Sequence, residues 1–231
     1  MFKAKEQCRK ALDNIPPHSV VYGRLGQHAR RITSYHAAKQ LFISPSPTLA
    51  QLRINALTDG KEIILPSPGL KDGFYLLRPF TIPFARLSFA VTFKGLLKYG
   101  RRLTLRDLGK LQIELLFAEA LAVDEQGVRL GDGLGFFDLS CAILAQSHAL
   151  HERPAAYALI DDEERFVKSL PSQDWDVRLD GFILPSGVHN IQGANFNNPC
   201  IYWDKIAAQR VRKITPLWEL WQSLSHTDLA R

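Results

Sequence analysis

The chain has 231 residues, 46% of them hydrophobic and 23% charged, and its 29 Lys and Arg against 23 Asp and Glu give a net charge of +6. This composition excludes disordered, collagen-like and coiled-coil proteins, and the length fits one large domain or two small ones. No apolar run reaches the roughly 18 residues of a membrane-spanning helix, and the N-terminus lacks the apolar stretch of a signal peptide. We expect a globular protein of the cytosol that does not span a membrane.

The three cysteines, Cys8, Cys141 and Cys200, lie far apart and form no Cys-x-x-Cys pair. This spacing argues against a disulfide framework and against a zinc ribbon. The positive excess suits either a nucleic acid or a phosphorylated or carboxylated small molecule. Which of these partners is favoured therefore depends on where the Lys and Arg residues lie.

The first clear pattern is a helix at the N-terminus. Residues 3–12 are good helix formers, and the proline at position 16 ends the helix. Lys5 and Arg9 are four positions apart, so their side chains project from the same face.

The segment after this helix alternates between helical and strand patterns. The expected elements are a loop through Gly23 and Gly26, a short helix near 30–38, a strand over 40–44, a helix with Thr48 as N-cap and Gly60 as its stop, and a buried strand over 61–66. A strand, a helix and a second strand in this order are typical of a parallel α/β unit.

The rest of the chain continues the pattern with apolar runs that are typical of strands covered on both faces. We expect strands over 74–77, 113–118, 157–160 and 181–184, and helices over 139–150 and 203–214. No internal repeat or low-complexity linker interrupts them. The sequence therefore predicts one three-layer α/β domain over 1–231, with a mostly parallel sheet flanked by helices.

A glycine-rich stretch, GVRLGDGLGFFD, occupies residues 127–138. Glycines at alternating positions let backbone amides approach an anion, and the N-terminus of the helix that follows adds a positive dipole end. No Gly-Lys-Ser/Thr follows as in a Walker A loop, and Phe136 replaces the third glycine of the dinucleotide pattern. The alternative is a glycine-rich turn in which Asp138 is only the N-cap of a helix.

Residues 113–139, IELLFAEALAVDEQGVRLGDGLGFFDL, resemble the hallmark of the 5-formyltetrahydrofolate cyclo-ligases, also called methenyltetrahydrofolate synthetases. The family pattern vDLvivPglAFDxxGxRLGyGgGYYDR matches them without a gap. Three more family blocks have counterparts in order: an N-terminal Lys-x-x-apolar-Arg at 5–9, a helix and Gly-Lys strand at 49–66, and LPxxxxDVxxD at 170–180. The resemblance implies a cyclo-ligase-like domain, of the CoA-transferase-like class of folds.

The chain departs from the family pattern mainly where the folate would bind. The family's folate-pocket Glu is missing, because Pro-Ser-Pro precedes Thr48. The family's Tyr-Tyr-Asp-Arg becomes Phe-Phe-Asp-Leu at 136–139, its strand-end Pro becomes Glu119, and its His-Asp becomes Trp-Asp at 175–176. The tail over 201–220 resembles the divergent methenyltetrahydrofolate synthetase domain-containing branch, for which a link to thiamine metabolism has been proposed.

The resemblance implies a reaction that depends on ATP and Mg²⁺. The formyl oxygen on N5 of the folate is phosphorylated, N10 attacks the activated carbon, and phosphate leaves as the ring closes. Arg129 and Asp138 are the implied catalytic residues, and Asp138 and Asp176 the implied metal ligands. The implied ATP-binding residues are Lys5, Arg9, Arg129, Gly131, Gly133, Gly135, Phe136 and Phe137.

Structural roles would also explain several of these residues. Lys5 and Arg9 would then be the solvated face of a terminal helix, and Arg129 would pair with Asp124 or Asp132.

Three other features do not by themselves indicate a ligand. Phe136 and Phe137 lack the hydroxyls of the family's tyrosines, so they can line a pocket or join the core without binding phosphate. His148 and His151 match no zinc motif and lie where a helix should end. The basic cluster over 94–110 would suit RNA, but the chain has no separate RNA-binding domain.

Three functions remain open at this point. The first is a cyclo-ligase that forms 5,10-methenyltetrahydrofolate, ADP and phosphate. The second is an ATP-dependent paralog that acts on another heterocycle, and the third is a non-catalytic nucleotide- or RNA-binding protein. We favour the first of these functions. It predicts a monomer with a small-molecule substrate and no nucleic-acid partner, in which the excess of Lys and Arg serves phosphate chemistry.

Overall fold

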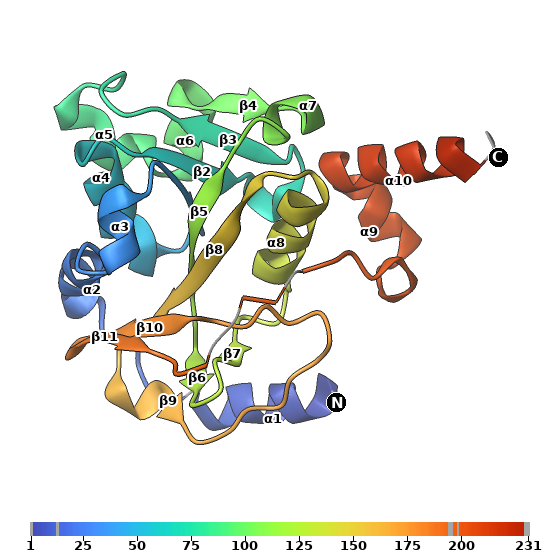
Figure 1. The fold of residues 1–231 in the computed structure, drawn as a ribbon. Helices are drawn as coiled ribbons and strands as arrows, with labels where there is room; N and C mark the ends of the chain where they lie inside the picture. The colour runs from blue at the N-terminus through green and yellow to red at the C-terminus, as the bar shows by residue number, and fades with distance from the viewer. Residues whose placement is uncertain (1, 13, 194–195, 198, 229–231) are drawn as a thin grey trace.

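Figure 1 shows a computed structural model that describes residues 2–12, 14–193, 196–197 and 199–228. Over these residues the main sheet has eight strands in the order β11-β10-β8-β5-β1-β2-β3-β4. β10, β8, β5, β1 and β2 run parallel, and β11, β3 and β4 are antiparallel to their neighbours. The strands are β1 (Gln40–Ile43), β2 (Glu62–Pro66), β3 (Phe74–Leu77), β4 (Arg101–Leu103), β5 (Ile113–Glu119), β8 (Leu150–Leu159), β10 (Gly181–Leu184) and β11 (Gly187–Asn190).

The predicted apolar runs all form strands of this sheet. β3 and β10 are buried at every position, and β1, β2 and β5 are buried over most of their length. Continuous burial is what a parallel sheet needs when helices cover both of its faces. β8 begins seven residues before the predicted strand at 157–160, because its first half is polar and exposed and carries no apolar signal.

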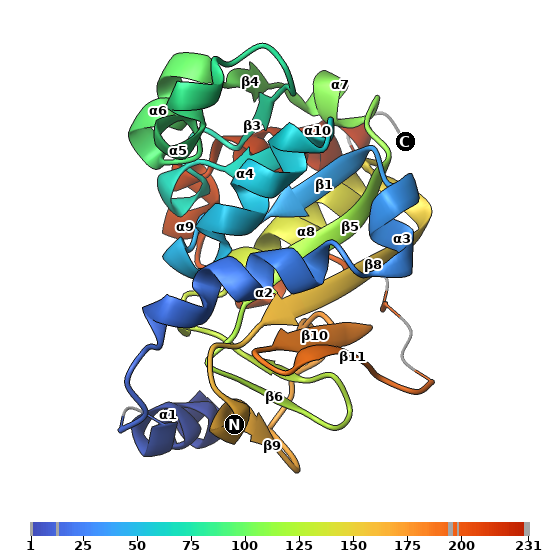
Figure 2. The ribbon, with the colours of Figure 1, turned by 90° about the vertical axis from the view of Figure 1, so that its left-hand side faces the viewer.

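Helices cover both faces of the sheet, as Figures 1 and 2 show. α2 (Tyr22–Ala29) and α4 (Ala50–Thr58) pack in one apolar core, and α8 (Phe136–Gln146), α9 (Ala208–Lys213) and α10 (Thr215–Asp228) pack in the other. The remaining helices are α1 (Phe2–Leu12), α3 (Thr33–Ala37), α5 (Leu87–Ala90), α6 (Phe93–Tyr99) and α7 (Leu105–Leu108). The predicted three-layer α/β class is confirmed. No helix of the described residues is both long and apolar enough to cross a bilayer.

Four helix predictions need correction. The helix expected over 139–150 is α8, which begins at Phe136 and ends at Gln146, and Leu150 already belongs to β8. The predicted loop through Gly23 and Gly26 is helix α2. Gly26 lets this helix pack closely against α4, because a Cβ added at position 26 would lie 3.1 Å from the amide nitrogen of Leu52. The helix expected near 30–38 is the five-residue α3. The helix expected over 203–214 is a 3₁₀ turn, Trp203–Lys205, followed by α9, because the two residues between them have extended backbone.

A small second sheet, formed by residues from the middle of the sequence, packs against α1. Its described strands are β7 (Arg129–Leu130), β6 (Ala122–Asp124) and β9 (Phe166–Val167). Cys8 and Leu12 of α1 pack against the apolar cluster of this sheet. The N-terminal helix therefore lies beside the loop that follows β7.

The basic residues concentrate at the other end of the molecule. Residues 78–106 contain seven Lys and Arg and no Asp or Glu. They include α5, α6 and β4, which both ribbon views place far from α1. Much of the excess charge therefore lies away from Lys5 and Arg9 of α1, and the expected role of these two residues in phosphate chemistry stays a prediction.

Candidate active site

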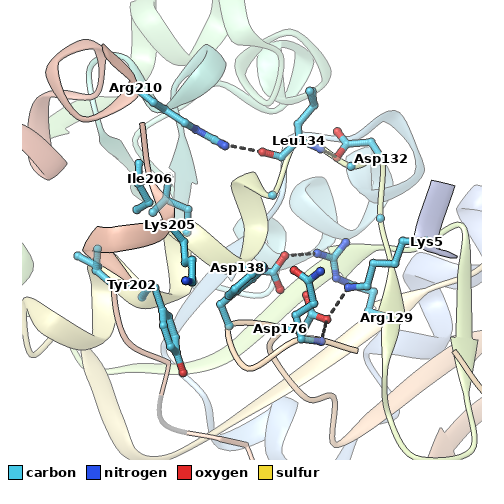
Figure 3. Close-up of a pocket in the computed structure, with 18 of the residues that line it drawn as sticks. Lys5, Arg129, Asp132, Leu134, Asp138, Asp176, Tyr202, Lys205, Ile206 and Arg210 are labelled. Atoms are coloured by element: carbon cyan, nitrogen blue, oxygen red, sulfur yellow. Dashed lines mark hydrogen bonds and ion pairs between the residues drawn. The ribbon is translucent and has the colours of Figure 1, made fainter. Parts of the chain in front are cut away.

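A cavity of about 210 Å³ opens between α1, the loop before α8 and the segment over 200–210 (Figure 3). Among its lining residues are five cationic side chains and three carboxylates, so its lining carries a net positive charge. The structure brings together eight predicted site residues here: Lys5, Arg9, Arg129, Gly131, Gly133, Gly135, Asp138 and Asp176. A positive cavity of this kind suits a negatively charged ligand.

The glycine loop forms one wall of the cavity and lies against Arg9. Arg9 Nε donates a hydrogen bond of 2.8 Å to the carbonyl oxygen of Gly131. Gly133 has φ +91°, and a Cβ at this position would lie 2.9 Å from Arg9 Cζ. Glycine is therefore required at 133 both by the backbone conformation and by the close approach of the guanidinium group.

The loop ends at the N-terminus of α8. Gly135, in the left-handed region, is the N-cap, and Asp138 lies in the first turn of the helix. The expectation that Asp138 caps the helix is therefore wrong. The Asp138 carboxylate accepts hydrogen bonds from Arg129 Nη2 at 2.9 Å and from the Val177 amide at 3.0 Å. The free amides of the first turn face the loop, where an anion can approach them.

Arg129 is held on three sides. Beyond its ion pair with Asp138, Nη1 donates to the carbonyl oxygen of Glu119 at 3.1 Å, and its Cζ lies 4.7 Å from the centre of the Phe137 ring. Its side chain is only 9% exposed. The guanidinium group is therefore fixed in one orientation at the cavity.

The alternative partners predicted for Arg129 have other roles. Asp124 is fully buried and accepts hydrogen bonds from three backbone amides, including that of Leu170. Asp132 accepts a hydrogen bond from the Leu134 amide within the glycine loop. Both carboxylates therefore stabilise loop backbone and do not neutralise Arg129.

Lys5 forms an ion pair with Asp176, which is 171 positions away in the chain (Figure 3). Both side chains are almost buried, at 11% and 9% exposure. The Asp176 carboxylate also accepts a hydrogen bond of 2.6 Å from the Gln173 amide. Lys5 therefore does not belong to a solvated helix face, which corrects that alternative for this residue.

The far wall of the cavity comes from the C-terminal segment, which the sequence did not predict as part of the site. It contributes Tyr202, Lys205 and Arg210. Arg210 Nη2 donates a hydrogen bond of 2.6 Å to the carbonyl oxygen of Leu134, and burial lowers the pKa of this guanidinium. The only sign in the sequence that this segment belongs to the site was the resemblance of residues 201–220 to the divergent methenyltetrahydrofolate synthetase domain-containing branch.

Phe136 and Phe137 are not among the residues that line this cavity, although their rings contact two of its cations, Arg210 and Arg129. The two phenylalanines line a second cavity of about 130 Å³ at the carboxyl ends of β1 and β2, together with Phe42 and Phe93. Phe137 is 7% exposed and packs against Phe42, with the ring centres 6.0 Å apart. The first turn of α8 therefore separates a positive cavity from an apolar one.

Comparisons with known proteins identify the family. The model of the 5-formyltetrahydrofolate cyclo-ligase family matches residues 9–185, which is about three quarters of the chain. The chain belongs to this cyclo-ligase family. The match includes the glycine loop, Arg129, Asp138 and Asp176, while Lys5 lies just before it and the segment with Arg210 lies after it.

Individual relatives of this cyclo-ligase family member are distant. The methenyltetrahydrofolate synthase domain-containing protein of Mus musculus is 23% identical over 198 residues, covering 84% of this chain and 52% of that protein. The 5-formyltetrahydrofolate cyclo-ligase of Escherichia coli K12 is 33% identical over 88 residues, covering 38% of this chain and 45% of that one. The chain thus spans about half the length of these curated relatives.

A solved structure supports the fold of the family. The NMR structure of the Aquifex aeolicus 5,10-methenyltetrahydrofolate synthetase matches with a TM-score of 0.53 and 18% identity. The match covers 83% of this chain and 94% of that one.

Proposed function

We propose that the chain is an ATP- and Mg²⁺-dependent cyclo-ligase that converts 5-formyltetrahydrofolate to 5,10-methenyltetrahydrofolate and releases ADP and phosphate. The observation that carries the proposal is the cavity in which Lys5, Arg9 and Arg129 surround the glycine loop and the N-terminus of α8. We place the reaction in a single domain over 1–231 that works as a cytoplasmic monomer.

Each residue of the cavity has a role that follows from its contacts. Lys5 and Arg9 bind the outer phosphates, and the amides of Gly131 to Phe137 hold the phosphate chain. Arg129, fixed by Asp138 and by the Glu119 carbonyl, neutralises charge on the phosphoryl group as the formyl oxygen attacks it. Positioning and charge neutralisation are the main requirements of this reaction.

The carboxylates of the cavity suit a magnesium ion that is held jointly with phosphates. The described residues contain no group of three His, Cys, Asp or Glu that would bind a metal without help. Mg²⁺ usually takes one or two carboxylates and completes its shell with phosphate oxygens and water. The hydrogen bonds of the Asp176 carboxylate fall on Oδ2, and Val177 places Asp138 next to it, so these two residues would hold the ion. A bound Mg²⁺ would offset the charge of the phosphates.

An absorbance assay for methenyltetrahydrofolate formation from 5-formyltetrahydrofolate, ATP and Mg²⁺ tests the proposal. We expect turnover by the wild type, and a loss of at least 100-fold in Arg129→Met, because a single oriented donor can contribute that much to such a step. Arg106→Met, an exposed arginine of α7, is the matched control and should keep full activity. A folded protein that binds ATP but forms no product would refute the cyclo-ligase reaction.

A second candidate is an ATP-dependent enzyme that acts on another heterocycle. The observation that favours it is the loop over 44–48, which has no carboxylate and forms one wall of the apolar cavity. This candidate predicts that calorimetry detects ATP binding but no binding of 5-formyltetrahydrofolate. Binding of both ligands would eliminate it.

A further inference from the structure

The order of the strands defines where a substrate should bind next to the phosphate cavity. From β1 the chain passes through α4 to β2 on one side, whereas from β5 it passes through α8 to β8 on the other side. α4 and α8 also cover opposite faces of the sheet (Figure 2). β1 and β5 are neighbours, so their carboxyl ends form a topological switch point, where open α/β sheets bind ligands.

Glu119 lies at this switch point. It is the last residue of β5, and it is exposed. The loop after β1 begins beside it, because the Ser44 amide donates to the carbonyl oxygen of Phe117 at 2.9 Å. Thr48, which is buried, donates a hydrogen bond of 2.6 Å from Oγ1 to Glu119 Oε1. Thr48 thus holds the Glu119 carboxylate at the carboxyl end of β5, and it does not cap α4 as expected from the sequence, because the N-cap is Leu49.

A buried arginine supports both the carboxylate and the loop. Arg53 is 3% exposed, and its Nη1 donates to the carbonyl oxygens of Ser44 and Ser46. Burial lowers the pKa of Arg53 to about 10, and the negative charge of Glu119 acts against this shift. Arg53 therefore remains charged near neutral pH and holds the loop that carries Thr48, the partner of Glu119.

Other observations separate Glu119 from a merely solvated surface residue. The carboxylate that follows β8 at the same edge, Asp161, is buried and paired with Arg165 at 3.0 Å, so it is not available to a ligand. The backbone carbonyl of Glu119 holds Arg129, which faces the phosphate cavity. A group bound at the Glu119 side chain would therefore lie next to the residue that we expect to meet the transferred phosphoryl group.

We propose that Glu119 is a specificity-determining residue that accepts hydrogen bonds from the N–H edge of the heterocyclic substrate. The inference rests on the proposed function and deepens it. A pterin ring presents a ring N–H next to an exocyclic amino group, and a carboxylate can accept both hydrogen bonds at once.

Equilibrium binding of pterin and of lumazine to the full chain tests this inference without any turnover. Lumazine has a carbonyl in place of the 2-amino group, so it places an acceptor opposite the carboxylate. We expect the wild type to bind pterin at least tenfold more tightly than lumazine, and Glu119→Gln to lose this preference while its ATP affinity stays unchanged. Glu119→Gln keeps an acceptor for Thr48 and should fold normally. Glu152→Gln, an exposed glutamate in the first half of β8, is the matched control and should bind as the wild type does.

Three outcomes would overturn the inference: equal affinity of the wild type for pterin and lumazine, no binding of pterin by a folded protein that binds ATP, or an unchanged preference in Glu119→Gln. The failure of the proposed reaction is distinguishable from these. If pterin binds in a Glu119-dependent way but 5-formyltetrahydrofolate and ATP give no product, the cyclo-ligase reaction is wrong and the role of Glu119 stands.

Discussion

Replacing Arg129 by Met should destabilise the fold mainly through the charge that it leaves on Asp138. The two side chains are 9% and 15% exposed, so their ion pair is largely removed from water. Removal of one partner of a buried pair costs about 3–5 kcal/mol. Asp138 keeps its hydrogen bond from the Val177 amide, and the Met side chain can still pack against Phe137. We therefore expect the free energy of unfolding to fall by about 3 kcal/mol, the lower end of this range.

The same substitution should cost much less when Asp138 is already neutral. In an Asp138→Asn background, Arg129→Met removes chiefly the hydrogen bond to the Glu119 carbonyl, which contributes about 1 kcal/mol. The double-mutant cycle should therefore give a coupling free energy of about 2 kcal/mol. Urea unfolding at pH 7, followed by tryptophan fluorescence, measures all four proteins. An equal loss of unfolding free energy in the two backgrounds would show that Asp138 does not depend on Arg129.

Three further predictions concern the loop, a buried carboxylate and a thiol. Gly131→Ala should weaken ATP binding at least tenfold in calorimetry, because a Cβ at this position would lie 2.4 Å from Arg129 Nη1. Gly23→Ala in α2, where a Cβ would meet no atom within 4 Å, is the matched control and should bind ATP as the wild type does; a similar loss in both variants would contradict the role of Arg129. Asp180→Asn should stabilise the protein at pH 7, because burial raises the pKa of Asp180 and the folded state therefore disfavours its charged form. The gain should shrink as the pH falls through the raised pKa and be lost below about 4, where both states are protonated; urea titrations with no pH dependence would refute this. Cys200 is exposed and lines the cavity, so it should react with a thiol reagent before Cys141, which is buried and whose pKa is raised by burial. ATP should slow the reaction of Cys200, and equal rates with and without ATP would argue against the cavity as the nucleotide site.

The strands and the glycine loop could be predicted because their signals are local. Apolar runs mark the buried strands, and alternating glycines mark the loop, without any knowledge of what lies across the fold. Helix α2 was missed for the opposite reason. Gly23 and Gly26 disfavour a helix on local grounds, and the compensation comes from packing against α4, which the sequence does not display.

The partners of the site residues depend on contacts between distant segments. Lys5 and Arg9 were predicted as a pair on one helix face, but Asp176, which neutralises Lys5, is 171 positions away. Arg129 has five carboxylates within ten positions, and only the folded chain shows that Asp138 is the one that binds it. Glu119 was noted only as a departure from the family pattern, because its contact with Thr48 joins residues 71 positions apart.

The segment over 78–106 and the candidate active site give the molecule two positive regions. The seven cations of the segment exceed the net charge of +6, so the remainder of the chain is close to neutral overall. The cavity beside α1 is nevertheless lined by five cationic side chains and three carboxylates, and it lies far from α5 and α6 (Figures 1 and 2). An anionic support therefore attracts either end of the molecule, so adsorption by charge alone should give mixed orientations, in some of which the candidate active site faces the support.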